Sequence, residues 1–134
     1  ELRLKPLILG KEMSELAKQF VPEILGNLCS DEAMENAINS MSKIPVNTYK
    51  EIISCLVTFN RYQDFGKIKI PSCLIAGRED MNAPFQTMEK MFLKLKKAEF
   101  HCIANAGHLV NLEAPVETNE IILNFLKKYF NELQ

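Results

Sequence analysis

The sequence predicts an α/β fold in which helices lead into two parallel strands that are flanked by further helices. Two short apolar runs, 72–76 and 99–103, have the length and composition of buried strands. A helix-like segment separates them, and this succession gives parallel strands joined by a right-handed crossover. Because the loops that follow parallel strands converge at one end of the sheet, residues after both runs are expected to meet there.

The first half of the chain predicts helices alone. Residues 11–28 have helical character, and we expect Pro22 to interrupt that helix because proline lacks the amide donor that a helix interior needs. Ser30 is a good N-cap for the next helix. Short helices of this kind must pack on one another to bury their apolar stripes. The stripes are Met34, Ala37, Ile38 and Met41, then Tyr49, Ile52, Ile53 and Leu56, the latter running on to about Phe59.

The second half predicts a helix after each strand. Pro84 fits the first helical position of one and Pro115 starts the other. Gly66, at the end of a polar connector, is the best candidate boundary, which divides the chain into a helical segment 1–66 and a strand-bearing segment 67–134. The predicted buried faces are Phe85, Met88, Phe92 and Leu95, then Ile122, Phe125, Leu126 and Tyr129.

The composition is that of a globular protein, because 47% hydrophobic residues in 134 positions suffice for one modest core. A formal net charge of −1 without a dense basic block argues against nucleic acid or a membrane surface as a partner. No signal-peptide pattern follows Glu1, and the apolar runs are too short to span a bilayer. We therefore expect a soluble, cytoplasmic protein.

The cysteines support the same location. They lack the paired spacing of a disulfide framework, and three lie in apolar periodic segments, where a thiol behaves as a small buried hydrophobe. We expect them to be reduced, as in an intracellular protein. We also expect no metal, because His101, Cys102 and His108 do not form two close ligand pairs. The cysteines are Cys29, Cys55, Cys73 and Cys102.

Side chains that can transfer protons follow both predicted strands. Asp80 comes three residues after Gly77, and His108 directly follows Gly107. Taken alone, Asp80 could simply cap a turn or a helix, and His108 could be a turn residue bonded to backbone. Their appearance at successive strand ends favours a joint site.

These motifs, in this order, resemble the C-terminal part of the α/β-hydrolase superfamily. The resemblance implies a partial α/β-hydrolase fold, with a helical cap in residues 1–66 and the nucleophile half absent. The cap would line the substrate pocket with Met34, Met41, Tyr49 or Phe59, unless these residues are ordinary core. The motifs are Ile68-Lys69-Ile70-Pro71, Gly77-Arg78-Glu79-Asp80 with Pro84, Ala106-Gly107-His108, and Glu113-Ala114-Pro115.

The resemblance also implies roles in a triad, whose members follow one another as Ser, Asp or Glu, then His. It makes His108 the general base and later the acid, and Asp80 the carboxylate that orients it. Glu79 competes for the acid role, although the Gly-x-x-Asp spacing favours Asp80. Glu113 would support the loop after His108, and His101, within a strand, would be structural. No cofactor or metal is implied.

The nucleophile itself is missing from the sequence. No serine, cysteine or aspartate has a glycine two places away on both sides, so the Gly-x-Ser-x-Gly elbow is absent. We expect the serine to lie upstream and this chain alone to be inactive. Two strands by themselves leave sheet edges and apolar surface exposed, so we also expect the chain to self-associate.

By the same resemblance, the parent protein hydrolyses an ester, thioester or lactone of a small organic acid through an acyl-enzyme, most like 3-oxoadipate enol-lactonase-like and carboxylesterase members. Epoxide hydrolases, haloalkane dehalogenases and C–C hydrolases share this half and stay open as alternatives. A non-catalytic interaction protein of the same fold is another. A nucleotide-binding domain is disfavoured, because no glycine-rich phosphate loop follows either strand.

Overall fold

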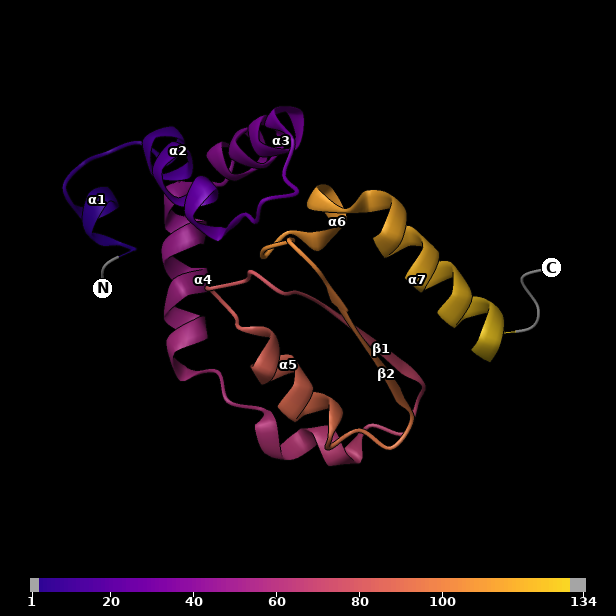
Figure 1. Cartoon of the computed structure of the whole chain (residues 1–134). Helices are drawn as coiled ribbons and strands as arrows, with labels where there is room; N and C mark the ends of the chain where they lie inside the picture. Colours follow the sequence, from indigo (N-terminus) through magenta and orange to yellow (C-terminus); the bar gives the residue numbers. More distant parts are fainter. Residues whose placement is uncertain (1–2, 131–134) are drawn as a thin grey trace. The chain divides into compact units, whose positions relative to one another are not determined.

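A computed structural model describes residues 3–130 of the chain and divides them into two compact units. The helical unit comprises the described residues up to Glu23 together with Ser30–Asn60, and the strand unit comprises Ile24–Cys29 and the described residues from Arg61 onward. The elements, labelled in Figure 1, are α1 (Lys5–Ile8), α2 (Met13–Ile24), α3 (Asp31–Ser42), α4 (Val46–Thr58), the 3-10 helix η1 (Tyr62–Lys67), β1 (Ser72–Gly77), α5 (Phe85–Phe92), β2 (Ala98–Ile103), α6 (Val110–Glu113) and α7 (Pro115–Tyr129).

The two units divide the chain at other positions than the candidate boundary at Gly66. The chain passes from one unit to the other after Asn60, six residues earlier. In addition, Ile24–Cys29, between α2 and α3, belongs to the strand unit although helices of the helical unit flank it. This short segment is important for the site described below.

The helical unit is built around a buried apolar cluster formed by Leu7, Met13, Leu16 and Tyr49. The predicted N-cap at Ser30 is confirmed, since its hydroxyl oxygen accepts the amide of Ala33 at 3.1 Å. Partly buried residues complete the cluster: Leu4, Phe20, Met41, Ile44, Val46 and Ile53.

The expected interruption at Pro22 is wrong, because α2 continues through this residue to Ile24. Only two helical residues follow the proline, so its missing amide affects a single bond near the end of the helix. The apolar stripe on α4 is also buried less completely than expected. Tyr49 is buried, but Ile52 is exposed and Leu56 keeps 58% of its surface exposed.

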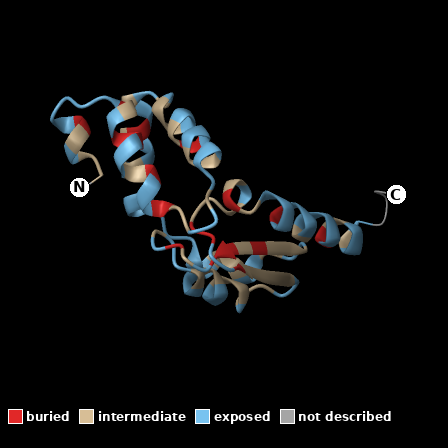
Figure 2. Cartoon of the chain, turned by 45° about the horizontal axis from the view of Figure 1, so that its top comes forward, coloured by how far each residue is buried: buried red, intermediate tan, exposed pale blue. Residues whose placement is uncertain are grey.

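The two strands of the strand unit pair in parallel, as predicted, with a register from Ser72 opposite Ala98 to Gly77 opposite Ile103. Their buried residues gather toward the carboxyl ends, which are red in Figure 2. The polar loops that follow the strands therefore begin at a well-packed edge.

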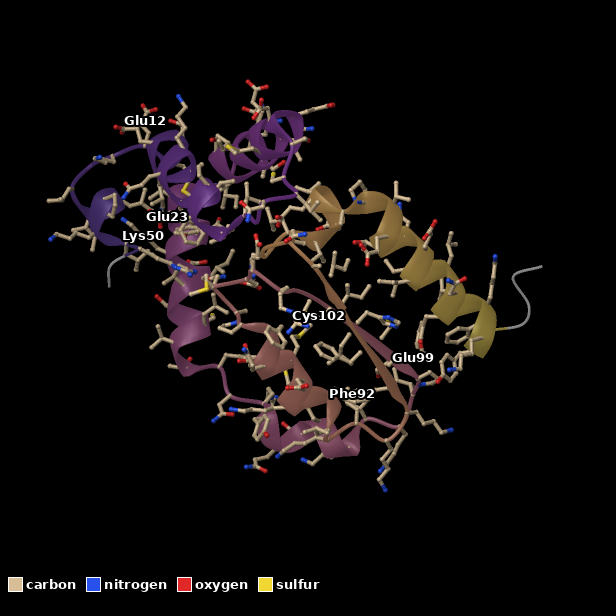
Figure 3. All side chains as sticks on the ribbon, viewed as in Figure 1. Glu12, Glu23, Lys50, Phe92, Glu99 and Cys102 are labelled. Atoms are coloured by element: carbon tan, nitrogen blue, oxygen red, sulfur yellow. The ribbon has the colours of Figure 1, made fainter. Side chains whose placement is uncertain are left out.

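Helices α5 and α7 pack on opposite faces of this two-stranded sheet. Successive residues of a strand point to opposite faces. The ring of Phe92 in α5 stacks on Phe100 with centroids 6.0 Å apart, whereas Lys128 of α7 donates to Glu99 at 2.7 Å. Figure 3 shows Phe92 and Glu99 on the two sides of the strands.

Two details of these helices differ from expectation. Pro84 is not the first residue of α5 but precedes it, because its ψ of 138° is extended rather than helical. On α7, Ile122 is 40% exposed, whereas Thr118 and Phe125 are buried. The Thr118 hydroxyl donates to the carbonyl of Val110 at 3.0 Å, which turns that face of α7 inward. Pro115 does begin α7, as predicted.

No helix within residues 3–130 is both long enough and apolar enough to cross a membrane.

Candidate active site

The loops after β1 and β2 bring Asp80 and His108 into direct contact. Nδ1 of the imidazole lies 2.8 Å from Oδ2 of the carboxylate. Asp80 follows β1 after a two-residue turn, and His108 follows β2 after four residues of loop. The predicted meeting of these two side chains at the carboxyl end of the sheet is therefore confirmed.

The carboxylate of Asp80 is fixed by its own loop. Asp80 is only 7% exposed, and its Oδ1 accepts the backbone amides of Asn82 and Ala83, each at 2.8 Å. This local turn leaves Oδ2 for the imidazole. Because an ionised carboxylate can only accept, the neutral imidazole of His108 in this contact is the tautomer with the proton on Nδ1 and the lone pair on Nε2.

The other side of the imidazole is accessible but not empty. The side chain of His108 keeps 34% of its surface exposed. Nδ2 of Asn82 lies 3.3 Å from Nε2. Nothing in the sequence pattern indicates Asn82, because its position near Nε2 depends on the exact form of the turn after Asp80.

Glu113 holds the loop that carries His108. Its carboxylate, on a residue only 6% exposed, accepts the amide of Gly107 at 2.9 Å through Oε2 and that of Leu109 at 2.9 Å through Oε1. These two amides flank His108 on either side. The predicted supporting role of Glu113 is confirmed, and Oε2 also accepts the amide of Gly26 at 2.6 Å.

The segment Ile24–Cys29 completes this support. The carbonyl of Ile24 accepts the amide of His108 at 2.7 Å. Glu79, the competitor for the acid role, bonds to this segment instead: its carboxylate accepts the backbone amide of Asn27 at 2.8 Å and the side-chain amide at 3.0 Å. Asp80, not Glu79, is thus the acid that contacts His108. In the sequence, most of this segment falls within the stretch 11–28, for which helical character was predicted.

Three backbones approach so closely here that only glycine fits. A Cβ on Gly107 would lie 2.5 Å from the carbonyl oxygen of Ile24 and from the amide nitrogen of Gly26. One on Gly77, at the end of β1, would overlap the carbonyl oxygen of Gly107. The loop before His108 also places Asn105 at a φ of 58°, a left-handed conformation that asparagine tolerates better than most residues.

The second histidine belongs to a separate cluster on the α7 side of the sheet. Nε2 of His101 lies 3.5 Å from the carboxylate of Glu99 without forming a hydrogen bond. The hydrogen bond from Lys128 lowers the pKa of Glu99, and the same bond raises the pKa of Lys128. Burial, and then the charge of Glu99, raise the pKa of the Cys73 thiol. These contacts agree with a structural part for His101.

Among the residues that the structure describes, no three His, Cys, Asp or Glu side chains are grouped as metal ligands. None of the four cysteines, all within residues 3–130, forms a disulfide, and Cys55 is exposed.

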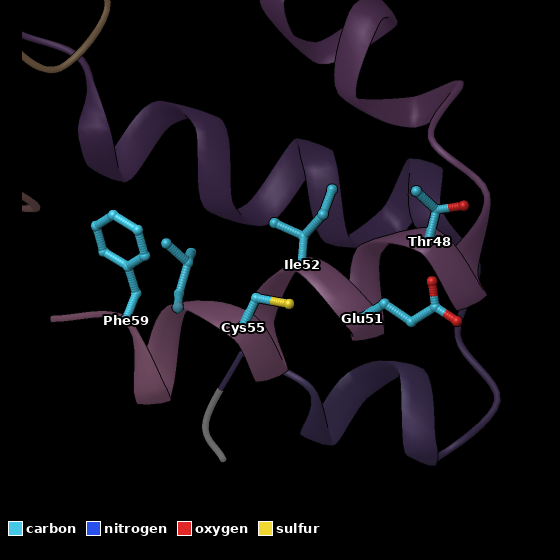
Figure 4. A pocket seen from close by; sticks show the side chains of 6 residues that line it. Thr48, Glu51, Ile52, Cys55 and Phe59 are labelled. Carbon is cyan, nitrogen blue, oxygen red and sulfur yellow. The ribbon is translucent and has the colours of Figure 1, made fainter. Parts of the chain in front are cut away.

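A separate hollow of about 340 Å³ lies along α4 in the helical unit. Figure 4 shows its side chains in a row on that helix. Of the four residues named as pocket linings from the sequence, Phe59 lines this hollow, whereas Met41 and Tyr49 belong to the core cluster and Met34 is half-buried on α3. The lining residues are Thr48, Glu51, Ile52, Cys55, Leu56 and Phe59.

Comparison with known proteins identifies the fold. The enol-lactonase from Burkholderia xenovorans LB400 superposes with a TM-score of 0.74 at 17% identity, over 86% of this chain and 45% of the lactonase. This is the C-terminal half of the α/β-hydrolase fold. In hydrolases of that fold, the triad members follow one another along the chain as Ser, then Asp or Glu, then His.

The curated proteins that the chain matches have hydrolase names. The chain is 29% identical over 119 residues to the AB hydrolase superfamily protein YisY of Bacillus subtilis. The aligned stretch covers 86% of the chain and 41% of YisY. It is 27% identical over 94 residues to Monoacylglycerol lipase ABHD6 of Homo sapiens. That aligned stretch covers 66% of the chain and 28% of the lipase. The chain thus spans less than half the length of either. No family model matches it.

Proposed function

We propose that the protein to which this chain belongs is a hydrolase that cleaves an ester, thioester or lactone of a small organic acid through an acyl-enzyme. His108 is the general base and then the acid, and Asp80 orients the imidazole and stabilises its charged form. The observation that carries the proposal is the 2.8 Å bond between Nδ1 of His108 and the buried carboxylate of Asp80.

The nucleophile in this proposal is a serine on an elbow upstream of residue 1. The 134 residues contain no elbow motif, and the relatives are more than twice as long as the stretch they share with the chain. The proposed reaction begins when Nε2 of His108 takes the proton of the serine hydroxyl as Oγ attacks the acyl carbon. His108 then returns that proton to the leaving oxygen or sulfur, and water hydrolyses the acyl-enzyme with the same base.

Two further parts of the proposal concern the chain by itself. We assign the helical segment 1–66 to a cap over the substrate, in a cytoplasmic protein with reduced thiols. We also propose that the isolated chain self-associates, because its sheet has two strands and large apolar side chains such as Ile70 and Val57 are exposed. Sedimentation of a compact monomer at micromolar concentration would contradict self-association.

The reaction is tested with p-nitrophenyl esters of short organic acids, on the protein encoded by the whole reading frame that contains these residues. Asp80→Asn is expected to lower kcat by roughly 10⁴-fold, because the amide stabilises the wrong tautomer, and His108→Ala by at least as much. His101→Gln is the matched control and should retain activity. Turnover that survives His108→Ala would refute the catalytic role, and absence of turnover on every ester would favour a non-catalytic protein of this fold.

The 134-residue chain alone is the second arm of this test. We expect it to show no turnover, because the base lacks a nucleophile to activate. A measurable rate that disappears in His108→Ala would overturn the upstream position of the nucleophile.

A further inference from the structure

The imidazole of His108 is held at both nitrogens by residues of a single loop. Asp80 accepts from Nδ1 at 2.8 Å, and Nδ2 of Asn82 lies 3.3 Å from Nε2. The backbone amide of Asn82 also donates to the free oxygen of Asp80 at 2.8 Å. The turn that orients the acid therefore also places the amide side chain on the far edge of the ring.

The amide group of Asn82 has the right chemistry for this position. Because Nδ1 donates to Asp80, Nε2 carries a lone pair that accepts from an amide N–H. In a triad, Nε2 is the atom that bonds to the nucleophile and takes its proton. Asn82 thus occupies the place that the nucleophile's hydroxyl would take. If the amide turned over, Oδ1 would face the ring, and it would accept from Nε2 only when that nitrogen is protonated.

We propose that Asn82 is a positioning residue that, together with Asp80, favours the Nδ1-protonated tautomer of His108 and shields Nε2 until a nucleophile displaces the amide. Its meaning for catalysis rests on the proposed function, but the hydrogen bond exists independently of turnover. Asn82 is half-buried, so its amide is restrained by the site and still displaceable. A leucine at position 82 has a similar size and can neither donate nor accept.

The tautomer is measured directly by long-range ¹H–¹⁵N NMR on the chain labelled at histidine. The sequence has two histidines, so His101 is an internal reference in every spectrum. In the unaltered chain, Nδ1 of His108 should resonate as a protonated nitrogen and Nε2 as a hydrogen-bonded acceptor. Asn82→Leu should move Nε2 toward the position of an unbonded acceptor. Asn82→Asp presents only acceptors and should move Nε2 to the protonated range at the same neutral pH.

The control is Asn124→Leu, the same chemical change at an exposed position of α7. Asn124→Leu should leave the His108 signals in place. All of the variants should leave the signals of His101 in place. Signals of His108 that are identical in the unaltered chain, Asn82→Leu and Asn82→Asp would overturn the proposal.

Acylation by diethyl pyrocarbonate gives a second readout. The lone pair of Nε2 attacks a carbonyl of the reagent, which releases ethanol and carbon dioxide, and mass spectrometry follows the product on each histidine. Asn82→Leu should raise the rate at His108 about fivefold, the factor that corresponds to one hydrogen bond of about 1 kcal/mol. Asn82→Asp should lower it, because a protonated Nε2 is not nucleophilic. Equal rates in all three proteins would refute shielding.

The outcomes separate this inference from the proposed function. If the Asn82 variants shift the His108 signals but the longer protein hydrolyses nothing, the positioning role stands and the hydrolase proposal fails. If ester hydrolysis depends on His108 while the Asn82 variants leave its signals unchanged, the positioning role alone fails.

Discussion

Replacement of Glu113 tests how the site is held together. This buried carboxylate accepts three backbone amides, from Gly26, Gly107 and Leu109, at 2.6 to 2.9 Å. In Glu113→Ala all three amides lose their partner in a place that water reaches poorly. Hydrogen bonds to a charged acceptor contribute about 1.5–3 kcal/mol each. The lower figure for three bonds gives a loss of about 4.5 kcal/mol in the free energy of unfolding, a large part of the roughly 5–15 kcal/mol of a typical domain.

Glu113→Gln separates the hydrogen bonds from the loss of volume. Its single carbonyl oxygen can replace Oε2 and keep the amides of Gly26 and Gly107. The side-chain NH₂ then faces the amide of Leu109, and two donors oppose each other. We expect about half the effect of alanine, roughly 2 kcal/mol. Glu120→Gln, exposed on α7, is the control and should stay within about 0.5 kcal/mol.

Two measurements quantify the stability that the Glu113 variants lose. Urea unfolding at one fixed chain concentration gives the change in free energy. Amide hydrogen exchange at Gly107 and Leu109 reports the loop itself and does not depend on how cooperatively the two units unfold. A Glu113→Ala protein that loses less than about 1 kcal/mol, with unchanged exchange at both amides, would refute the view that this carboxylate fixes the His108 loop.

Two other predictions concern the α7 side of the sheet and the thiols. The pKa of Glu99 is lowered in the folded state, so the stability it contributes is present above its usual value of 4.5 and is lost as pH falls through the lower folded value. Lys128→Met removes the main cause, so an NMR titration should show the pKa of Glu99 rising and a flatter stability profile in acid; an unchanged titration would contradict this assignment. Iodoacetamide at neutral pH should modify the exposed Cys55 before Cys73, whose pKa burial raises. Peptide mapping that finds Cys73 modified first would show the reverse.

The arrangement of the strands and the acid–histidine contact could be predicted because they follow from general rules of topology. Two apolar runs separated by a helix give adjacent parallel strands, and adjacent parallel strands deliver their loops to one edge. Asp80 and His108 each follow such a run. Neither conclusion needs the exact conformation of a loop, and both hold in the structure, with a separation of 2.8 Å between the side chains.

What the sequence did not indicate depends on backbone detail. Segment Ile24–Cys29 binds the site mainly through main-chain amides and carbonyls, which leave no side-chain pattern to recognise. The position of Asn82 depends on the form of one turn. On α7, two neighbouring isoleucines, Ile121 and Ile122, fit the apolar period equally well, and in the structure Ile121 is half-buried whereas Ile122 is exposed.

The contacts that hold Asp80 and His108 all come from the strand unit. Asp80 is fixed by amides of its own turn, and the amide of His108 itself bonds to Ile24. Glu113 holds the amides on either side, and all of these groups belong to the strand unit. For the proposed reaction, this means that His108 needs little rearrangement before it takes a proton, which is the condition under which a positioned base is most effective. In the proposed reaction, a nucleophile would displace the Asn82 amide at Nε2, while the other contacts of His108 are already made within the strand unit.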